Sequence, residues 1–305
     1  MKVSTSYFFD RASQQVSQAQ NRVAATQSQM ATGKQLVAPS DNPQQAMVIE
    51  RLRTALTRQE TLAANLQTVQ RRYEAEEAAL REGSDLLMRM KELSVQAAND
   101  TNGPSDRAVI AIELKSLREQ MLGVVNARDD QGQSVFSGTR ARGAAFAEVD
   151  GRVTYEGDQT PVRITSGDQR LQQYNRSGTD VFGRVVRETA DGPQGVGFFD
   201  AIDDLIAAVE TGSQPNLQRG MAEMDLLQQN LSLGLAETGA DQNNVQSQQD
   251  LIDQTILRLK TTLSDVEDLD YTEAVTRMNK QMLSLEAAMS SFAKVSQLNL
   301  FDYLR

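Results

Sequence analysis

The sequence predicts a mainly α-helical chain, a long discontinuous helical bundle and coiled-coil rod built from both termini, with a small β-rich domain inserted. Three observations predict this class. No proline lies between Pro43 and Pro104 and none follows Pro215, so both flanks are free to be helical. Eleven of the 19 glycines fall between Gly132 and Gly197, which marks a turn-rich middle. Aromatic residues make up only 5%, which suits helices packed along seams better than a compact core.

The first flank predicts a helix with one seam of small and apolar residues. Its spacings alternate between three and four, the heptad register of a helix that packs along a partner. Gly33 suits the end of this helix. Because a single helix of this kind is marginal in water, it needs a partner from the other terminus or from another copy. The seam positions are Phe9, Ala12, Val16, Ala19, Val23, Thr26 and Met30.

Two more helices are expected before the middle zone. Asp41 or Asn42 can cap a second helix, and Pro43 suits its first turn. That helix should continue for roughly 55 residues, to the breaker Asn-Gly-Pro at 102–104. We expect Ser105 to cap a third helix, antiparallel to the second. Its seam comprises Ile110, Leu114, Leu117, Met121 and Val124.

The middle zone carries strand signals. Asp150-Gly151, between two short β-prone segments at 146–149 and 153–155, predicts a hairpin with a type I′ turn. Gly157-Asp158 predicts a second turn before a strand at 162–165. The glycine-rich segment 192–197 has the wrong glycine order for a dinucleotide-binding fingerprint, and we expect a flexible loop there. A short helix is expected near 198–210.

After Pro215 the pattern returns to helix, and no glycine or proline follows Gly239. We predict three parts: a terminal coiled coil of 1–40 with 267–305, a helical part of 41–135 with 215–266, and a β-rich part of 136–214. The last helix has a heptad seam like that of the first. Its positions are Tyr271, Val275, Met278, Met282, Leu285, Met289 and Phe292.

The composition excludes several classes of site. The chain has no cysteine and no histidine, which removes thiolate catalysis, the commonest general base and the commonest metal ligand. A formal net charge of −10 argues against nucleic-acid binding. Gly33-Lys34 lacks the earlier glycine of a phosphate-binding loop, and a calcium loop around Asp129 would need a ligand at Ala127. We therefore expect no enzyme, no cofactor and no metal.

No apolar run near the N-terminus is long enough for a cleavable signal, and none approaches a membrane span of about 20 residues. We therefore expect no membrane partner. The protein is expected either to stay in the cytoplasm or to leave the cell by a route that uses no cleaved signal.

Several motifs, in this order, resemble those of the bacterial flagellin and hook-associated protein family. Residues 30–34 (MATGK) and 39–43 (PSDNP) are similar to its STGK and PSDDP motifs, with Asn42 in place of the second aspartate. Residues 134–139 (SVFSGT), 155–158 (YEGD) and 181–183 (VFG) resemble segments of its β-domain. Residues 268–274 (DLDYTEA) and 298–304 (LNLFDYL) are similar to members found at the hook–filament junction.

The resemblance implies a structural subunit exported through the flagellar type III channel and assembled outside the cell, at the hook–filament junction. It implies that the terminal helices form an inner coiled-coil tube. The implied partners are further copies of the chain, the first junction protein (hook-associated protein 1), flagellin and an export chaperone. On this basis the seams are the assembly interface. The predicted interface residues are Phe9, Val16, Val23, Met30, Met278, Met282, Leu285, Met289, Phe292, Leu300 and Phe301.

Two alternatives stay open. The chain could be a short flagellin, although family filament subunits end in a short Leu-Leu-Arg rather than LNLFDYL. It could also be a cytoplasmic coiled-coil signalling adaptor resembling a chemoreceptor bundle, although the β-rich insert would interrupt such heptads.

Overall fold

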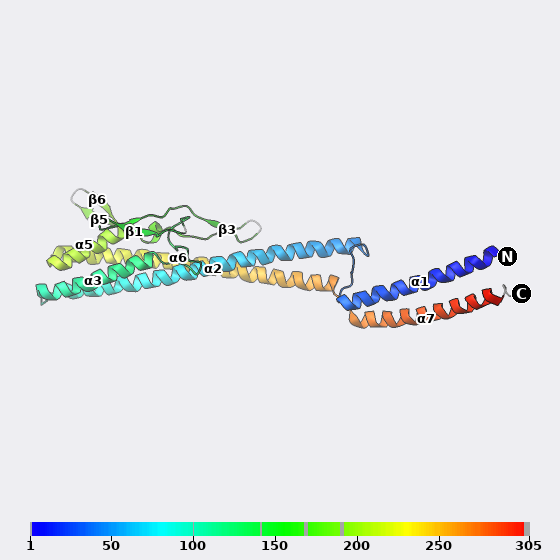
Figure 1. The fold of residues 1–305 in the computed structure, drawn as a ribbon. Helices are drawn as coiled ribbons and strands as arrows, with labels where there is room; N and C mark the ends of the chain where they lie inside the picture. The colour runs from blue at the N-terminus through cyan, green and yellow to red at the C-terminus, as the bar shows by residue number, and fades with distance from the viewer. Residues whose placement is uncertain (1, 100, 141, 168–169, 190–191, 302–305) are drawn as a thin grey trace. The chain divides into compact units, whose positions relative to one another are not determined.

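The computed structural model describes residues 2–99, 101–140, 142–167, 170–189 and 192–301, and for 2–6, 8 and 295–301 it describes the backbone alone. It confirms a mainly helical fold with a small β-rich middle (Figure 1). The helices of the described residues are α1 (Lys2–Thr32), α2 (Pro43–Ala97), α3 (Pro104–Val125), α4 (Gly178–Val181), α5 (Phe198–Thr211), α6 (Gln214–Glu267) and α7 (Tyr271–Phe301).

The described strands form three separate antiparallel hairpins. They are β1 (Phe146–Val149) with β2 (Arg152–Tyr155), β3 (Arg163–Thr165) with β4 (Leu171–Gln173), and β5 (Val185–Thr189) with β6 (Gly192–Val196). The first is the predicted hairpin, and its turn residues Asp150 and Gly151 have φ of 52° and 76°. Positive φ at both central positions is the geometry of a type I′ turn. The prediction of a flexible loop at 192–197 was wrong, because five of its residues form β6.

The chain folds into two compact units, which we describe separately. The first comprises Met1–Gln59 with Gln254–Arg305, and the second comprises Glu60–Asp253. The long helices α2 and α6 contribute residues to both. The division into three parts drawn from the sequence stays a prediction.

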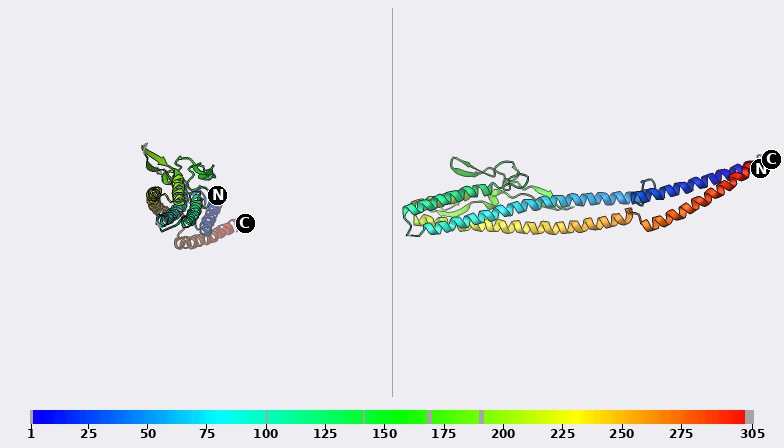
Figure 2. Two further views of the ribbon diagram at one scale, coloured as in Figure 1. Left: turned by 90° about the vertical axis from the view of Figure 1, so that its left-hand side faces the viewer. Right: turned by 60° about the horizontal axis from the view of Figure 1, so that its bottom comes forward.

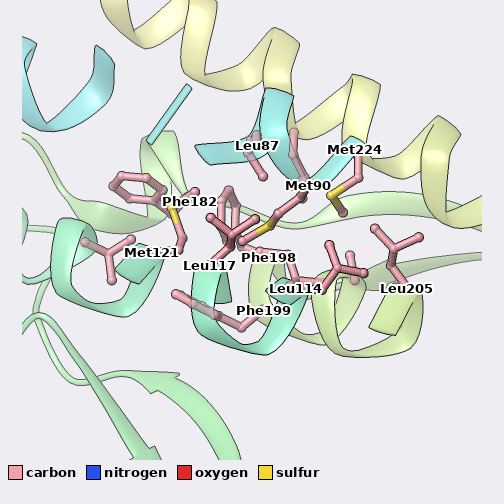
Figure 3. Close-up of a cluster of buried hydrophobic side chains, with 14 of the residues drawn as sticks. Leu87, Met90, Leu114, Leu117, Met121, Phe182, Phe198, Phe199, Leu205 and Met224 are labelled. Atoms are coloured by element: carbon pink, nitrogen blue, oxygen red, sulfur yellow. The ribbon is translucent and has the colours of Figure 1, made fainter. Parts of the chain in front are cut away.

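The second unit holds the main hydrophobic core. The C-terminal half of α2 lies beside α3, and α5 and α6 complete the cluster (Figures 1 and 2). The predicted α3 seam is buried in it as a whole. Phe182, Phe198 and Phe199 contribute aromatic rings to this cluster (Figure 3). The ring of Phe182 meets those of Phe136 and Phe198 edge-on, at centroid distances of 5.0 and 5.4 Å, a favourable geometry.

Two glycines inside α6 allow its neighbours to approach closely. A Cβ at Gly220 would lie 2.7 Å from the Leu205 side chain of α5, and one at Gly234 would lie 3.2 Å from Val181 of α4. Glycine costs a helix roughly 1 kcal/mol relative to alanine. At Gly220 and Gly234 the missing side chain lets α5 and α4 pack closely against α6, which offsets this cost.

The helix starts agree with the sequence in one case and differ in another. The Asn42 side-chain oxygen accepts a hydrogen bond from the Gln45 amide at 3.2 Å, so the predicted cap of α2 is confirmed. The prediction that Ser105 caps α3 was wrong. The N-cap is Gly103, whose amide donates to the Asp106 carboxylate at 3.0 Å. Pro104, at the first helical position, needs no amide partner, so the cap lies two residues before Ser105.

Candidate assembly surface on the terminal helices

Helices α1 and α7 lie side by side within the first unit (Figures 1 and 2). The rings of Phe9 and Phe292 lie 5.1 Å apart between their centroids. Along α1, Val16, Val23 and Met30 are half-buried, as the heptad seam predicts. The two ends of the chain therefore pack on each other, 255 residues apart in sequence at one contact.

A polar pair interrupts this seam. Thr26 is only 3% exposed, and its hydroxyl donates to the Gln281 side-chain oxygen at 2.8 Å. Near the base of the pair, the Tyr271 hydroxyl donates to the Met30 carbonyl at 3.1 Å. These two bonds fix the axial position of α7 against α1.

The segments that leave α1 and enter α7 are joined to each other. Gly33 has φ of 70°, the left-handed conformation of a helix C′ residue, and its carbonyl accepts from the Leu269 amide at 2.9 Å. Glu267 is buried and forms salt bridges of 2.6 Å to both Lys34 and Arg53. The hydrogen bond from Lys34 is the main cause that lowers the pKa of Glu267. This joint holds the bases of both terminal helices together.

The predicted seam of α7 is divided between two faces. Met278, Leu285 and Phe292 are half-buried against α1. Met282 and Met289, in contrast, are 52% and 51% exposed. The α1–α7 pair therefore covers only part of the apolar surface of α7.

Three of the exposed apolar residues of α7 form one line, which we call the uncovered stripe: Val275, Met282 and Met289. They recur every seven residues, so they lie on one face of α7, about 100° from the neighbouring positions 274, 281 and 288. Val275 is 44% exposed. A row of large apolar side chains at heptad spacing is the pattern of a helix that packs against a further helix.

The remaining predicted interface residues have different positions. Phe9 is 37% exposed at the distal end of the pair. Leu300 and Phe301 belong to the last turn of α7, but their side chains lie outside the described part.

The sequence reasoning missed a second feature of this pair. Arg22, Arg277 and Lys280 line a groove between α1 and α7, together with Ala19, Gln281 and Ser284. The spacing of Arg277 and Lys280, three residues apart, is the signal that could have indicated it.

The motifs of the middle zone form a corner in the second unit. A Cβ at Gly138, whose φ is 68°, would lie 2.1 Å from the Asp158 carbonyl oxygen. The Asp158 carboxylate accepts from the hydroxyl and the amide of Thr139 and from the Thr160 amide. These bonds, led by that of the Thr139 side chain, lower the pKa of Asp158 to about 2. The Tyr155 hydroxyl is within hydrogen-bond distance of two carbonyl oxygens at this corner. They belong to Phe136, at 3.0 Å, and to Asp158, at 2.8 Å.

Two arginines, Arg72 buried and Arg176 half-buried, attach the middle zone to the helices. Arg72 of α2 pairs with Asp129 at 2.7 Å, and Arg71 pairs with the next residue, Asp130, at 3.3 Å. These ion pairs account for the two aspartates of the segment that we tested as a calcium loop. Arg176 pairs with Glu76 of α2 at 2.7 Å, and Glu76 also accepts from the Thr238 hydroxyl of α6. Burial raises the pKa of Glu76, against the opposing effect of Arg176. These ion pairs join segments that are far apart in sequence.

No group of three acidic, histidine or cysteine side chains in the described residues could hold a metal ion. In the same residues, no helix is long and apolar enough to span a membrane.

Comparison with known proteins agrees with this architecture. The model of the bacterial flagellin N-terminal helical region matches residues 3–141, and that of the C-terminal helical region matches 221–304. The chain is 26% identical to flagellar hook-associated protein 3 of Escherichia coli (strain K12), over 99% of each chain. It is 24% identical to flagellar hook-associated protein 3 of Salmonella typhimurium (strain LT2), over 100% of each chain.

A similar fold occurs in the solved structure of a putative flagellar hook-associated protein from Vibrio parahaemolyticus. The TM-score is 0.67 at 22% identity, covering 75% of this chain and all of that one. The two family models together account for both helical ends, in the order in which the family carries them. This chain belongs to the bacterial flagellin family.

Proposed function

We propose that this protein is a structural subunit of the bacterial flagellum at the hook–filament junction, and that it assembles through its terminal helices. The full-length similarity to two hook-associated proteins 3 supports this place in the flagellum. The proposed location is outside the cell, after export by the flagellar type III system. We assign no catalytic role.

The observation that carries the proposal is the uncovered stripe on α7. Burying a large apolar side chain completely stabilises by about 1.5–3 kcal/mol. About half of Met282 and Met289 is still exposed, so a further helix that covered them would contribute about 1 kcal/mol at each residue. Repeated at every subunit of an array, this contribution favours assembly over the isolated chain.

The proposed partners follow from the same surface. A further copy of the chain can present α1 or α7 to the stripe of its neighbour, which gives a ring of identical subunits. At the two ends of that ring, hook-associated protein 1 and flagellin would meet the same kind of helical surface. An export chaperone would cover the stripe of α7 before assembly.

A substitution on the stripe tests assembly. We expect Met289→Asp and Met282→Asp to leave the second unit folded and to abolish incorporation into the flagellum. Leu283→Asp is the matched control, because Leu283 is 69% exposed beside Met282 and lies on another face of α7. The measurement is an immunoblot of flagella sheared from cells that produce each variant as the sole copy. Normal incorporation of Met289→Asp would refute the stripe as an assembly surface.

Deletion of the gene tests the place in the flagellum. Bare hooks in electron micrographs, with flagellin monomers in the medium, are expected for a junction subunit on which the filament nucleates. Bare hooks without any secreted flagellin would favour the short-flagellin alternative. Normal filaments would contradict both.

A further inference from the structure

The groove between α1 and α7 is lined by three cations. It has about 180 Å³ of space, and its charged residues are Arg22, Arg277 and Lys280. We call it the basic groove. The pair as a whole is also basic: α1 carries three Lys or Arg and one Asp, and α7 carries three Lys or Arg and two Glu. This net positive charge contrasts with a formal net charge of −10 for the whole chain.

The cations of the basic groove lack sufficient partners in the chain itself. Within the described residues, Arg22 and Lys280 form no salt bridge, and Arg277 has one at 3.6 Å, to Glu273 of its own helix. The Arg277 Nε is buried without any hydrogen-bond partner. Arg277 also donates to the Gln29 side-chain oxygen at 3.4 Å. A buried donor atom without an acceptor costs about 1–3 kcal/mol, so an anionic group from outside would stabilise this groove.

The basic groove and the uncovered stripe lie on different sides of α7. At 100° per residue, Arg277, Lys280 and Ser284 point to within about 40° of the direction opposite Met282. Around the axis of α7, helix α1 lies between the direction of the uncovered stripe and that of the basic groove. The terminal pair therefore offers an apolar flank and a cationic flank, and these can meet two different surfaces.

The same unit also presents an acidic surface, in which one of four carboxylates pairs with cations. Four of the six residues at 265–270 are acidic, namely Asp265, Glu267, Asp268 and Asp270. Glu267 pairs with Lys34 and Arg53, whereas Asp265, Asp268 and Asp270 are exposed and form no salt bridge among the described residues. This acidic segment includes the last turn of α6, which contains no basic residue. Asp265 lies in this last turn, where a carboxylate opposes the helix dipole, so an external cation would stabilise it. Asp270 instead caps α7: its carboxylate accepts from the amides of Thr272 and Glu273 at 2.8 and 3.2 Å.

We propose that the basic groove binds the acidic segment 265–270 of a second copy of this chain. Within the described residues of one copy, no ion pair joins the two surfaces. A contact between two different patches of identical subunits is heterologous, and it generates a ring or a helical array. The inference rests on the proposed function and adds to it the ionic contact that orients neighbouring subunits.

Charge reversal with rescue tests this contact in assembled flagella. We expect Arg22→Glu/Lys280→Glu to reduce the amount of protein in sheared flagella at least ten-fold, and Asp265→Lys/Asp268→Lys to do the same. The variant with all four changes should recover most of the incorporation, because the groove is then acidic and the segment 265–270 carries the new lysines. The matched control is Arg11→Glu/Lys294→Glu, which makes the same charge change on the same two helices outside the groove, and it should incorporate normally.

The absence of cysteine allows a second, direct measurement. In the variant Lys280→Cys/Asp265→Cys, oxidation of sheared flagella should produce a ladder of cross-linked copies, and each single variant should not. Lys294→Cys/Asp265→Cys is the control pair. This readout applies even if a reversal variant fails to fold, which circular dichroism of the purified variants would reveal.

Normal incorporation of both reversal variants would overturn the inference, and so would the absence of a ladder in flagella that contain the cysteine variant. A cross-link to a protein of another size would assign a different occupant and would also overturn it. These results leave the proposed function intact if Met289→Asp still fails to incorporate. Absence of the wild-type protein from flagella would refute the proposed function instead.

Discussion

Removing one partner of the ion pair between Arg176 and Glu76 should strongly destabilise the second unit. The Glu76 side chain is 1% exposed and that of Arg176 is 13% exposed. Breaking a buried pair by removing one partner costs about 3–5 kcal/mol, because it leaves an uncompensated buried charge. For a unit of this size, that cost corresponds to a fall in Tm of about 6–20 °C. We therefore expect Arg176→Met to lower the Tm by that amount.

The pH dependence of this variant provides a second check. Because burial raises the pKa of Glu76, the folded state binds this proton more tightly than the unfolded chain. Removing Arg176 takes away an influence that lowers this pKa, so the pKa of Glu76 rises further in the variant. The destabilisation should therefore grow as the pH rises from acidic to neutral values. In Glu76→Leu/Arg176→Met neither partner of this pair is left charged and alone, and most of the lost stability should return.

The assay is urea and thermal unfolding followed by near-ultraviolet circular dichroism. The chain has no tryptophan, so tyrosine and phenylalanine report on side-chain packing. Arg81→Met is the control, because Arg81 lies on α2, the helix that carries Glu76. It removes an ion pair with Glu77 whose arginine is 67% exposed, and it should cost less than about 1 kcal/mol. If Arg176→Met costs no more than this control, the account of the buried pair is refuted.

Further predictions concern the corner of the middle zone. Gly138→Ala should destabilise the protein by at least about 1–3 kcal/mol in urea unfolding, because φ is 68° and the new Cβ would collide with the Asp158 carbonyl. Gly239→Ala, in open space within α6, should instead stabilise it by up to about 1 kcal/mol. Equal effects of the two substitutions would contradict this account. The Asp158 carboxylate has a folded-state pKa of about 2, so its contribution to stability should be present above about pH 4 and lost toward pH 2. In Asp158→Asn that acid-dependent loss should be smaller, as acid titration of the hairpin resonances by NMR would show; an unchanged titration would exclude this role.

The helical part of the fold could be predicted because its signals are local. The end of α1 at Gly33, the cap of α2 at Asn42 and the hairpin at Asp150-Gly151 each depend on a few neighbouring residues. The β5–β6 hairpin could not be predicted in this way. Its second strand contains glycine and proline, and its pairing accompanies the burial of Val185 and Val196 in the core, which is a long-range contact.

The candidate surface was predictable only in part. Heptad spacing identifies Met278 and Met282 as apolar seam positions, but it does not tell how much of the seam one partner covers. That depends on the direction from which α1 approaches α7. The buried pairs of Arg72 and Arg176 were also out of reach, since each joins residues at least 57 positions apart. The sequence therefore specifies helices and stripes, while the tertiary fold decides which stripes stay open.

The polar pair of Thr26 and Gln281 has a consequence for how accurately the terminal helices are aligned. In a seam of small and apolar residues, a shift by one heptad changes the packing energy little, and several alignments would be close in energy. A buried hydroxyl that meets its acceptor in one alignment alone makes the others unfavourable, since each would leave a polar group unpaired. Replacing both residues by leucine would give a tighter pair of helices with several registers. The native hydrogen bond therefore selects one alignment, so that α1 and α7 are in the same register in every copy of the chain.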